Sequence, residues 1–232
     1  MIMSDNAAAQ KTSPVHIFDV DNTVVRKTSA GYFLRMALHD KYIRFSQVSA
    51  LLVDWANYKF ARPDNDFIEN IVKNLSGLNK NDIEHVAKEC FEKHIKPNIY
   101  TGAAKIIKET MEKGERVIFA TSSFDFIIRP LEEYFGIEGS LSTRLEYSGG
   151  ITTGKLAGYS FFGPKKKLAA QEWLDRNNIR SADVHFYSDS YTDIPLLEYC
   201  GNPVAVNPDR LLKQKAIKHV WKIMRFKEVL GN

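Results

Sequence analysis

The sequence predicts an α/β protein, with a doubly wound parallel sheet and an all-helical cap domain inserted after the first strand. Short apolar runs that end abruptly in polar residues alternate with helical patterns, as in parallel strands joined by helical crossovers. About 70 residues of helical pattern separate the first two strands, far more than a single crossover needs. We therefore expect a core of residues 14–28 and 101–232, a helical cap of residues 29–100 and a disordered leader of residues 1–13.

The N-terminal half of the chain reads as one strand followed only by helices. The strand covers residues 14–20, and a long helical region with apolar residues at helical spacing follows over residues 29–60. The stretch Arg62–Asn65 breaks this pattern. Further helices are predicted over residues 66–75, 80–95 and 101–113.

The C-terminal half alternates strands with helices. Residues 140–160 hold short β-prone pieces and several glycines, which suggests a hairpin flap. A Gly163-Pro164 pair begins a helix, because proline is favoured in a first helical turn. The other predicted strands are 116–120, 184–188, 204–206 and 219–223, and the helices are 125–135, 164–178, 192–199 and 209–218.

Composition sets broad limits on the protein class. The chain of 232 residues is 44% hydrophobic and 26% charged, which is ordinary for a soluble globular protein. No apolar run reaches the roughly 20 residues that a membrane span needs, and residues 1–13 lack the apolar centre of a secretory signal. Two cysteines without a CxxC pattern, Cys90 and Cys200, fit a reducing compartment, so we expect a cytoplasmic protein.

Asp19 and Asp21 come where the first apolar run ends. They are offset by one period of the pleat, so both could face one pocket. Two carboxylates this close repel each other unless a cation lies between them or one is protonated. Mg²⁺ suits such an oxygen-rich site. The alternative is an ordinary solvated turn, in which Asp is common.

Polar groups also follow the later strands, and a parallel sheet brings all these strand ends to one edge. A carboxylate there can attack phosphorus, and a second can protonate the leaving oxygen. Lysine and hydroxyl groups can hold phosphate oxygens, and a third carboxylate can complete a Mg²⁺ site. The converging residues are Asp19, Asp21, Thr23, Thr121, Ser122, Lys166, Asp189 and Asp193.

Four motifs in this order resemble the haloacid dehalogenase (HAD) superfamily in its phosphatase form. Phe18–Thr23 matches DxDxT, Ala120–Ser123 matches the second motif, Gly163–Lys166 matches the lysine motif and Ser188–Pro195 matches the last. The resemblance implies a HAD-like Rossmannoid core with a helical cap of the C1 type. It implies a Mg²⁺-dependent phosphomonoester hydrolase that acts through an aspartyl-phosphate.

The resemblance also implies a role for each matching residue. Asp19 would be the nucleophile and Asp21 the acid and base. Mg²⁺ would be held by the Asp19 carboxylate, the Asp21 backbone carbonyl and Asp189. Asp193 would lie one layer further out or bind the metal through water, and Thr23 would also lie in that outer layer.

The phosphate would be held by Thr121, Ser122 and Lys166. Lys165 and Lys167 are alternatives for the lysine, and the family's G-x-x-K spacing favours Lys166.

Within the superfamily, the subgroup most similar to this chain is that of the phosphoserine-phosphatase-like subfamily IB hydrolases. Phosphoserine phosphatases carry Glu where this chain has Thr28, and Ser-Gly-Gly where it has Thr121-Ser122-Ser123. They carry Asn where it has Thr192. These differences weaken the case for an amino-acid substrate. The Ser188–Pro195 motif looks more like that of a related group, which includes phosphatidylglycerophosphate phosphatases. The expected substrate is therefore a phosphorylated small molecule or lipid.

Other functions have less support from the residues. Dehalogenases of the family lack the second aspartate, so Asp21 argues against that activity. A receiver-like signalling domain also uses Asp, Thr and Lys, but it places its acidic pair and its acceptor differently and has no helical insert. A non-catalytic phosphate-binding protein on the same type of fold is the remaining alternative.

Two further patterns concern partners. The region 29–60 is rich in aromatic residues, which either pack within the cap or face an apolar leaving group, and Arg62 could reach a second anionic group. Residues 210–227 hold seven Lys or Arg and no acid. This segment either docks on the sheet or contacts a membrane surface. We expect no nucleic-acid partner, and the oligomeric state stays open.

Overall fold

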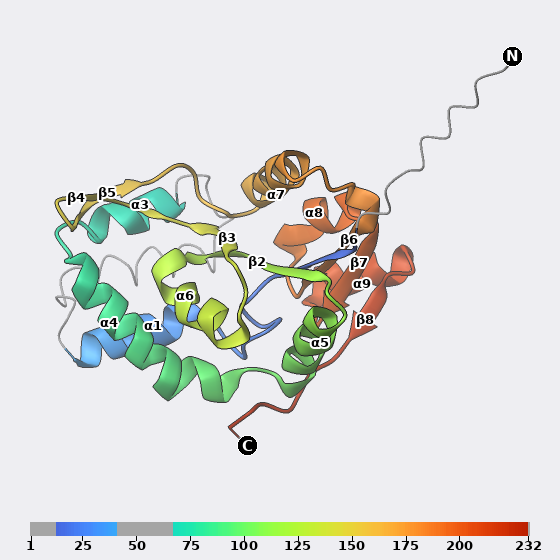
Figure 1. The fold of residues 1–232 in the computed structure, drawn as a ribbon, viewed down its shortest axis with the longest axis horizontal. Coiled ribbons are helices and arrows are strands. Elements are labelled where there is room, and N and C mark those ends of the chain that lie inside the picture. The colour runs from blue at the N-terminus through green and yellow to red at the C-terminus, as the bar shows by residue number, and fades with distance from the viewer. Residues whose placement is uncertain (1–12, 41–66, 232) are drawn as a thin grey trace, which may run out of the picture.

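The computed structural model describes residues 13–40 and 67–231 (Figure 1). Three predictions concern residues outside these ranges: almost all of the disordered leader, the helical region beyond residue 40 with most of its aromatic residues, and the role of Arg62.

The core is a six-stranded sheet in which every neighbouring pair is parallel, as predicted. The order β3-β2-β1-β6-β7-β8 places the first strand in the middle, with the winding direction changing between β1 and β6. Ligands bind at such a switch point, beyond the carboxyl ends of the strands. The strands are β1 (Val15–Phe18), β2 (Arg116–Phe124), β3 (Ser140–Thr143), β6 (Val184–Ser188), β7 (Asn202–Val206) and β8 (Lys222–Met224).

Helices cover both faces of this sheet (Figure 1). Side chains alternate along β1, so Phe18 joins a core cluster with Leu131 of α6, whereas Ile17 joins a second cluster with Leu174 of α7. Both strand faces are therefore apolar, which explains the continuous hydrophobic runs in the sequence. The helices are α5 (Thr101–Glu112) and α6 (Asp125–Phe135) on the first face, and α7 (Pro164–Arg176), α8 (Ile194–Tyr199) and α9 (Arg210–Lys218) on the second.

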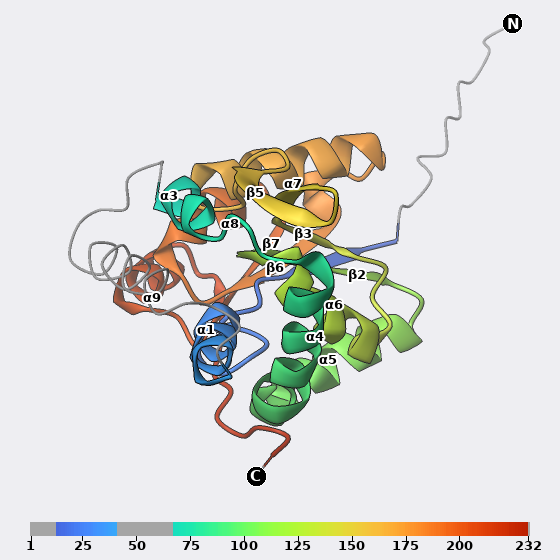
Figure 2. The ribbon, with the colours of Figure 1, turned by 90° about the vertical axis from the view of Figure 1, so that its left-hand side faces the viewer.

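Between β1 and β2 the described residues form helices, as predicted. They lie together at one end of the molecule, at the left of Figure 1 and towards the viewer in Figure 2. α1 begins at Ser29 as predicted and ends at His39, and the N–H of the following Asp40 still donates to the carbonyl of Met36 at 2.9 Å. The elements are α1 (Ser29–His39), α3 (Phe67–Asn74), α4 (Lys80–Cys90), a π-helical turn (Phe91–Ile95) and a 3₁₀ turn (Lys96–Asn98).

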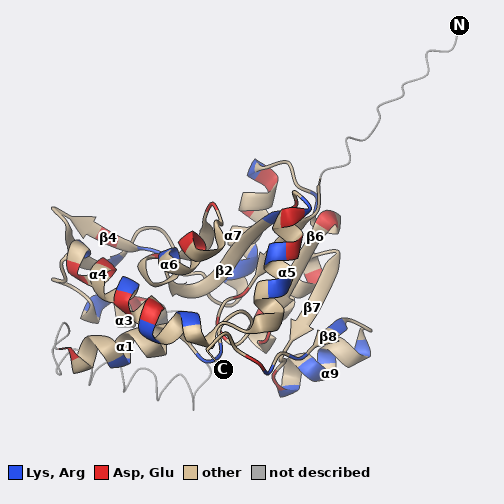
Figure 3. Cartoon of the chain, turned by 60° about the horizontal axis from the view of Figure 1, so that its bottom comes forward, with Lys and Arg blue, Asp and Glu red and all other residues tan. Residues whose placement is uncertain are grey.

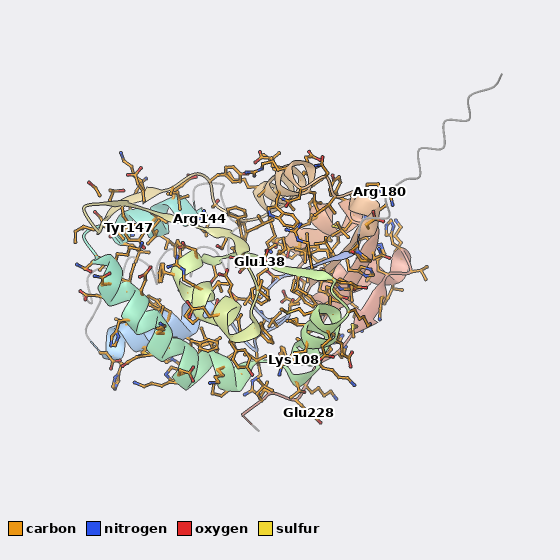
Figure 4. All side chains as sticks on the ribbon, in the orientation of Figure 1. Lys108, Glu138, Arg144, Tyr147, Arg180 and Glu228 are labelled. Carbon is orange, nitrogen blue, oxygen red and sulfur yellow. The ribbon has the colours of Figure 1, made fainter. Side chains whose placement is uncertain are left out.

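Residues 140–160 form more than the predicted hairpin flap. β3 joins the main sheet as an edge strand, because Leu141 packs into the second core cluster and its backbone pairs with β2. Only β4 (Leu145–Ser148) and β5 (Ile151–Leu156) make a hairpin. The hairpin lies against the helical insert, where Tyr147 lies under the ammonium of Lys80 at 5.5 Å (Figure 4).

The second strand is longer than the apolar run suggests. β2 continues to Phe124 and shifts register against β3 between Ala120 and Phe124. The hydroxyl of Thr143 donates to the carbonyl of Ser122 at 3.0 Å, which ties this irregular stretch to the edge strand. The polar second motif therefore lies within the strand and not after it.

The basic C-terminal segment docks on the sheet through part of its apolar surface. Leu212 and Ala216 of α9 are fully buried, whereas Leu211 and Ile217 are 52% and 62% exposed. Figure 3 shows Lys and Arg gathered on α9 and β8. Across the described part of the chain, no helix has both the length and the apolar character needed to cross a bilayer.

Candidate active site

Asp19 stands directly after the central strand. Its N–H donates to the carbonyl of Tyr187 at 2.8 Å, so the backbone stays aligned with β6 for one residue beyond β1. The carboxylate is only 6% exposed. A fully buried strand thus delivers one carboxylate to the carboxyl edge of the sheet, at its switch point.

Lys166 pairs with this carboxylate. Its Nζ donates to Asp19 Oδ1 and to Asp193 Oδ2, at 2.8 Å each, and the residue is 4% exposed. The hydroxyl of Ser188 donates to the same Asp193 oxygen at 2.7 Å. Gly163 precedes the helix with φ of +56°, a conformation that favours glycine, and so turns the chain to place Lys166 in the first turn of α7.

The two neighbouring lysines point elsewhere. Lys165 donates to Glu69 of α3 at 3.3 Å, and Lys167 lies over the ring of Tyr199 at 5.5 Å. Of the three candidates in the motif, Lys166 is therefore the one that the structure brings to Asp19.

Asp21 lies on the tight turn that follows. Its Oδ1 accepts the N–H of Ser29 at 2.8 Å, and it is partly buried. Burial raises its pKa, and the hydrogen bonds from Ser29 oppose that rise. Thr23 is fully buried, and its hydroxyl has no hydrogen-bond partner among the described residues.

The second motif supplies hydroxyls from β2. Thr121 is 1% exposed, and its Oγ1 accepts the N–H of Ser123 at 3.1 Å. Ser122 is partly exposed. Since β1 and β2 run in parallel register, with Phe18 opposite Phe119, Thr121 and Ser122 lie at the same edge as Asp19.

Asp189 follows β6, next to β1 on the other side. Burial, and after it the nearby charges of Asp19 and Asp193, together raise its pKa to about 9. Burial also raises the pKa of Asp19 to about 7, against the opposing effect of Lys166. For Lys166 burial acts to lower the pKa, but the two carboxylates beside it raise it. One ammonium therefore balances only part of the negative charge here.

The excess of carboxylate charge over the single ammonium of Lys166 suggests a bound cation, so we ask whether these residues fit a metal ion. Among the described residues no three His, Cys, Asp or Glu side chains form a ready-made metal cluster. The structure gives the Asp189 carboxylate no hydrogen-bond partner in the described ranges, although other carboxylates lie close enough to raise its pKa. The carboxylates of Asp19 and Asp189 and the backbone carbonyl of Asp21 form a hard oxygen donor set, so these residues fit Mg²⁺.

Sequence reasoning missed three hydroxyl groups at this edge. Ser188 holds Asp193, and Ser29 contacts both Asp21 and Ser123. Ser123 lies in the second motif and Ser188 in the last, so the motifs themselves could have indicated both residues. Ser29 carried no signal beyond its place at a helix start.

Comparisons with known proteins show the family of this chain. A family model described as haloacid dehalogenase-like hydrolase matches residues 17–198. A protein named for inhibition of morphological differentiation, from Streptomyces azureus, is 31% identical over 90% of this chain and 77% of its own. A histidinol-phosphatase from Neisseria meningitidis serogroup C is 29% identical over 91% of this chain and 98% of its own.

Solved structures share the fold. A protein of unknown function from Bordetella pertussis Tohama I superposes with a TM-score of 0.83, at 22% identity over 92% of this chain and 99% of its own. A phosphoserine phosphatase described as a phospho-aspartyl intermediate analogue superposes with a TM-score of 0.67, at 20% identity over 95% of this chain and 96% of its own. On the match to its family model, the chain belongs to the haloacid dehalogenase-like hydrolase family.

Proposed function

We propose that this HAD-family phosphatase is a Mg²⁺-dependent phosphomonoester hydrolase that works through an aspartyl-phosphate on Asp19. The observation that carries the proposal is the buried contact of 2.8 Å between Lys166 and Asp19 at the switch point of the sheet. It places a nucleophilic carboxylate beside a cation that can bind phosphate oxygens. The relative titled as a phospho-aspartyl intermediate analogue supports the same chemistry.

In the first step, an Asp19 oxygen attacks phosphorus, and the bond from phosphorus to the leaving oxygen breaks. Asp21 donates its proton to that oxygen, so the alcohol leaves neutral. Lys166, Thr121 and Ser122 hold the phosphoryl oxygens as charge shifts onto them. Asp193 and Ser188 hold Lys166 in place from the other side.

In the second step, water attacks the phosphorus of the aspartyl-phosphate. Asp21, now ionised, accepts the proton of that water, and Asp19 leaves as a carboxylate. The products are the alcohol and inorganic phosphate, and Asp21 regains its starting proton. One residue thus acts as acid and then as base.

Asp19, Asp189 and the backbone carbonyl of Asp21 would hold Mg²⁺. The ion would supply positive charge that screens the nucleophile from the anionic substrate. The raised pKa of Asp189 supports this assignment, because a bound cation would offset both the burial of this carboxylate and its repulsion by Asp19 and Asp193.

The leaving group is a small-molecule or lipid alcohol in this proposal. Thr28 is exposed and is the N-cap residue of α1, at the position where phosphoserine phosphatases carry a substrate-binding Glu. The absence of a carboxylate at this position weakens the case for phosphoserine as the substrate. The histidinol-phosphatase relative supports a small alcohol, and the exposed Leu211 and Ile217 beside basic residues favour a lipid.

Both cysteines are unpaired and buried, as expected for the cytoplasmic location that we propose.

The test is phosphate release from a panel of phosphomonoesters, with Mg²⁺ and with EDTA. The panel holds phosphoserine, histidinol phosphate, sugar phosphates, phosphatidylglycerophosphate and lysophosphatidate. We expect Mg²⁺-dependent release from one class, and loss of at least about 10³-fold in kcat for Asp19→Asn. Release that survives Asp19→Asn would remove this residue from the mechanism. No release from any ester would favour the non-catalytic alternative.

A further inference from the structure

Helix α1 of the insert begins directly at the proposed acid. Its first residue, Ser29, donates its backbone N–H to Asp21 Oδ1 at 2.8 Å. The N-cap residue Thr28 makes no side-chain capping bond. The Asp21 carboxylate therefore accepts one of the first N–H groups of α1, which have no partner within the helix, and it lies at the positive end of the helix dipole.

The side chain of Ser29 makes a second connection. Its hydroxyl lies 2.7 Å from the hydroxyl of Ser123 on β2. Ser29 is fully buried, and Ser123 is 5% exposed. The N–H of Ser123 in turn donates to Oγ1 of Thr121 at 3.1 Å. A short chain of hydrogen bonds thus joins the proposed acid to the residues that would bind phosphate.

The rest of α1 packs on both the core and the insert. Phe33 meets Phe126 of α6 edge to face, with ring centroids 5.2 Å apart, and α1 also packs on α4. Movement of these helices would move Ser29. The geometry of Asp21 therefore depends on where the insert lies, although Asp21 itself belongs to the core.

We propose that Ser29 and Ser123 are positioning residues for the acid–base step, so that the seating of α1 on the core orients Asp21. This inference rests on the proposed role of Asp21. A general acid must lie within hydrogen-bond reach of the leaving oxygen, and a small displacement lowers the rate of steps that need its proton. The loss should therefore depend on how much the leaving group needs a proton.

Two esters of nearly the same shape separate this effect from general damage. Phenyl phosphate releases a basic phenolate that needs a proton, whereas p-nitrophenyl phosphate releases a stable anion. We expect Ser29→Ala and Ser123→Ala each to lower kcat/KM for phenyl phosphate by about 10-fold, and kcat/KM for p-nitrophenyl phosphate by less than about twofold, because kcat/KM reports the step in which the leaving group departs. The double variant should lose no more than either single one, because both changes break one contact.

Ser29→Pro removes the N–H bond as well. Proline is accepted at the first helical position, and Thr28 has the extended conformation that a following proline requires. We expect a larger selective loss for phenyl phosphate than with Ser29→Ala. Thermal melts of each variant report whether the fold is kept.

Ser142→Ala is the matched control, because Ser142 is a buried serine on β3 that accepts a hydrogen bond from Ser140 at 2.9 Å. Ser142→Ala should not lower the rate for phenyl phosphate more than the rate for p-nitrophenyl phosphate. Asp21→Asn is the reference for loss of the acid. If Asp21→Asn lowers kcat/KM of both esters equally, the proposed role of Asp21 as the acid of the first step is wrong. If Asp21→Asn is selective but the Ser29 and Ser123 variants are not, the positioning proposal is overturned.

Discussion

At the scale of single residues, position in the fold separates three adjacent lysines that the sequence presents as equivalent. Lys166 is buried between Asp19 and Asp193, whereas Lys165 forms a partly exposed ion pair with Glu69 and Lys167 lies over an aromatic ring. A buried ammonium with two carboxylates is costly to disrupt, because removal leaves unpaired buried charge. Exposed pairs contribute little.

Lys166→Ala should therefore lower kcat by at least about 10²-fold, since both the phosphate contact and the charge partner of Asp19 are lost. Lys165→Ala should change kcat by less than about twofold, because its partner lies on the insert and the pair is partly exposed. Steady-state kinetics on the best substrate of the panel checks both. An active Lys166→Ala enzyme would return the lysine role to one of its neighbours.

Residues whose chemistry depends on motif spacing could be predicted, and those that act through tertiary contacts could not. Asp19 and Asp189 follow strand ends, Lys166 lies at a helix start and Thr121 lies in the last part of β2, so parallel topology gathers them at one edge. The contact between Ser29 and Ser123 joins residues 94 positions apart. Nothing in either local sequence encodes that meeting.

At the scale of elements, the prediction was right where the spacing of apolar residues determines the type of element. It was wrong where strand pairing determines which sheet a strand joins. The parallel strands β1 and β6 and the helices around them follow from their apolar patterns. The edge strand β3 is as short as the hairpin strand β4, and both are polar, so their sequences do not tell which sheet each joins. Tertiary packing of Leu141 decides for β3.

The contact between the hairpin and the insert gives a prediction at this scale. Gly154 and Gly150 both have positive φ, of +78° and +80°. A Cβ at Gly154 would lie 3.0 Å from Cβ of Ser76 in the insert, whereas one at Gly150 meets nothing within 4 Å.

Both Gly→Ala changes should cost about 1 kcal/mol for backbone conformation. Gly154→Ala should cost about 1–2 kcal/mol more, because the hairpin must shift away from the insert. Urea unfolding of the two variants measures the difference, and equal losses would mean that this contact is loose.

At the scale of the whole molecule, the charge of Asp189 opposes folding, because this carboxylate is buried beside other carboxylates. The pKa of Asp189 is about 9 in the folded protein, against 3.8 for an ordinary Asp. Between these values the folded state holds a proton that the unfolded chain has released. Without metal, the contribution of Asp189 to the free energy of unfolding therefore falls as pH rises from about 4 to about 9.

Asp189→Asn removes that charge. In EDTA at pH 8 we expect the variant to melt at least about 3 °C above the unmodified protein. Mg²⁺ should raise the melting temperature of the unmodified protein and leave the variant nearly unchanged, since one of the proposed ligands is gone. Differential scanning fluorimetry with and without Mg²⁺ checks both shifts. An equal response of the two proteins to Mg²⁺ would place the ion elsewhere.

The central place of the first strand has a consequence for how the chain is made. β1 leaves the ribosome before its neighbour β6 and before Lys166, which follows Asp19 by 147 positions. The hairpin that borders the insert also follows the insert in the chain. Contacts this distant in sequence form slowly, and the nascent chain holds an unpaired apolar strand meanwhile. The sheet can therefore close around β1 only after β6 has been made.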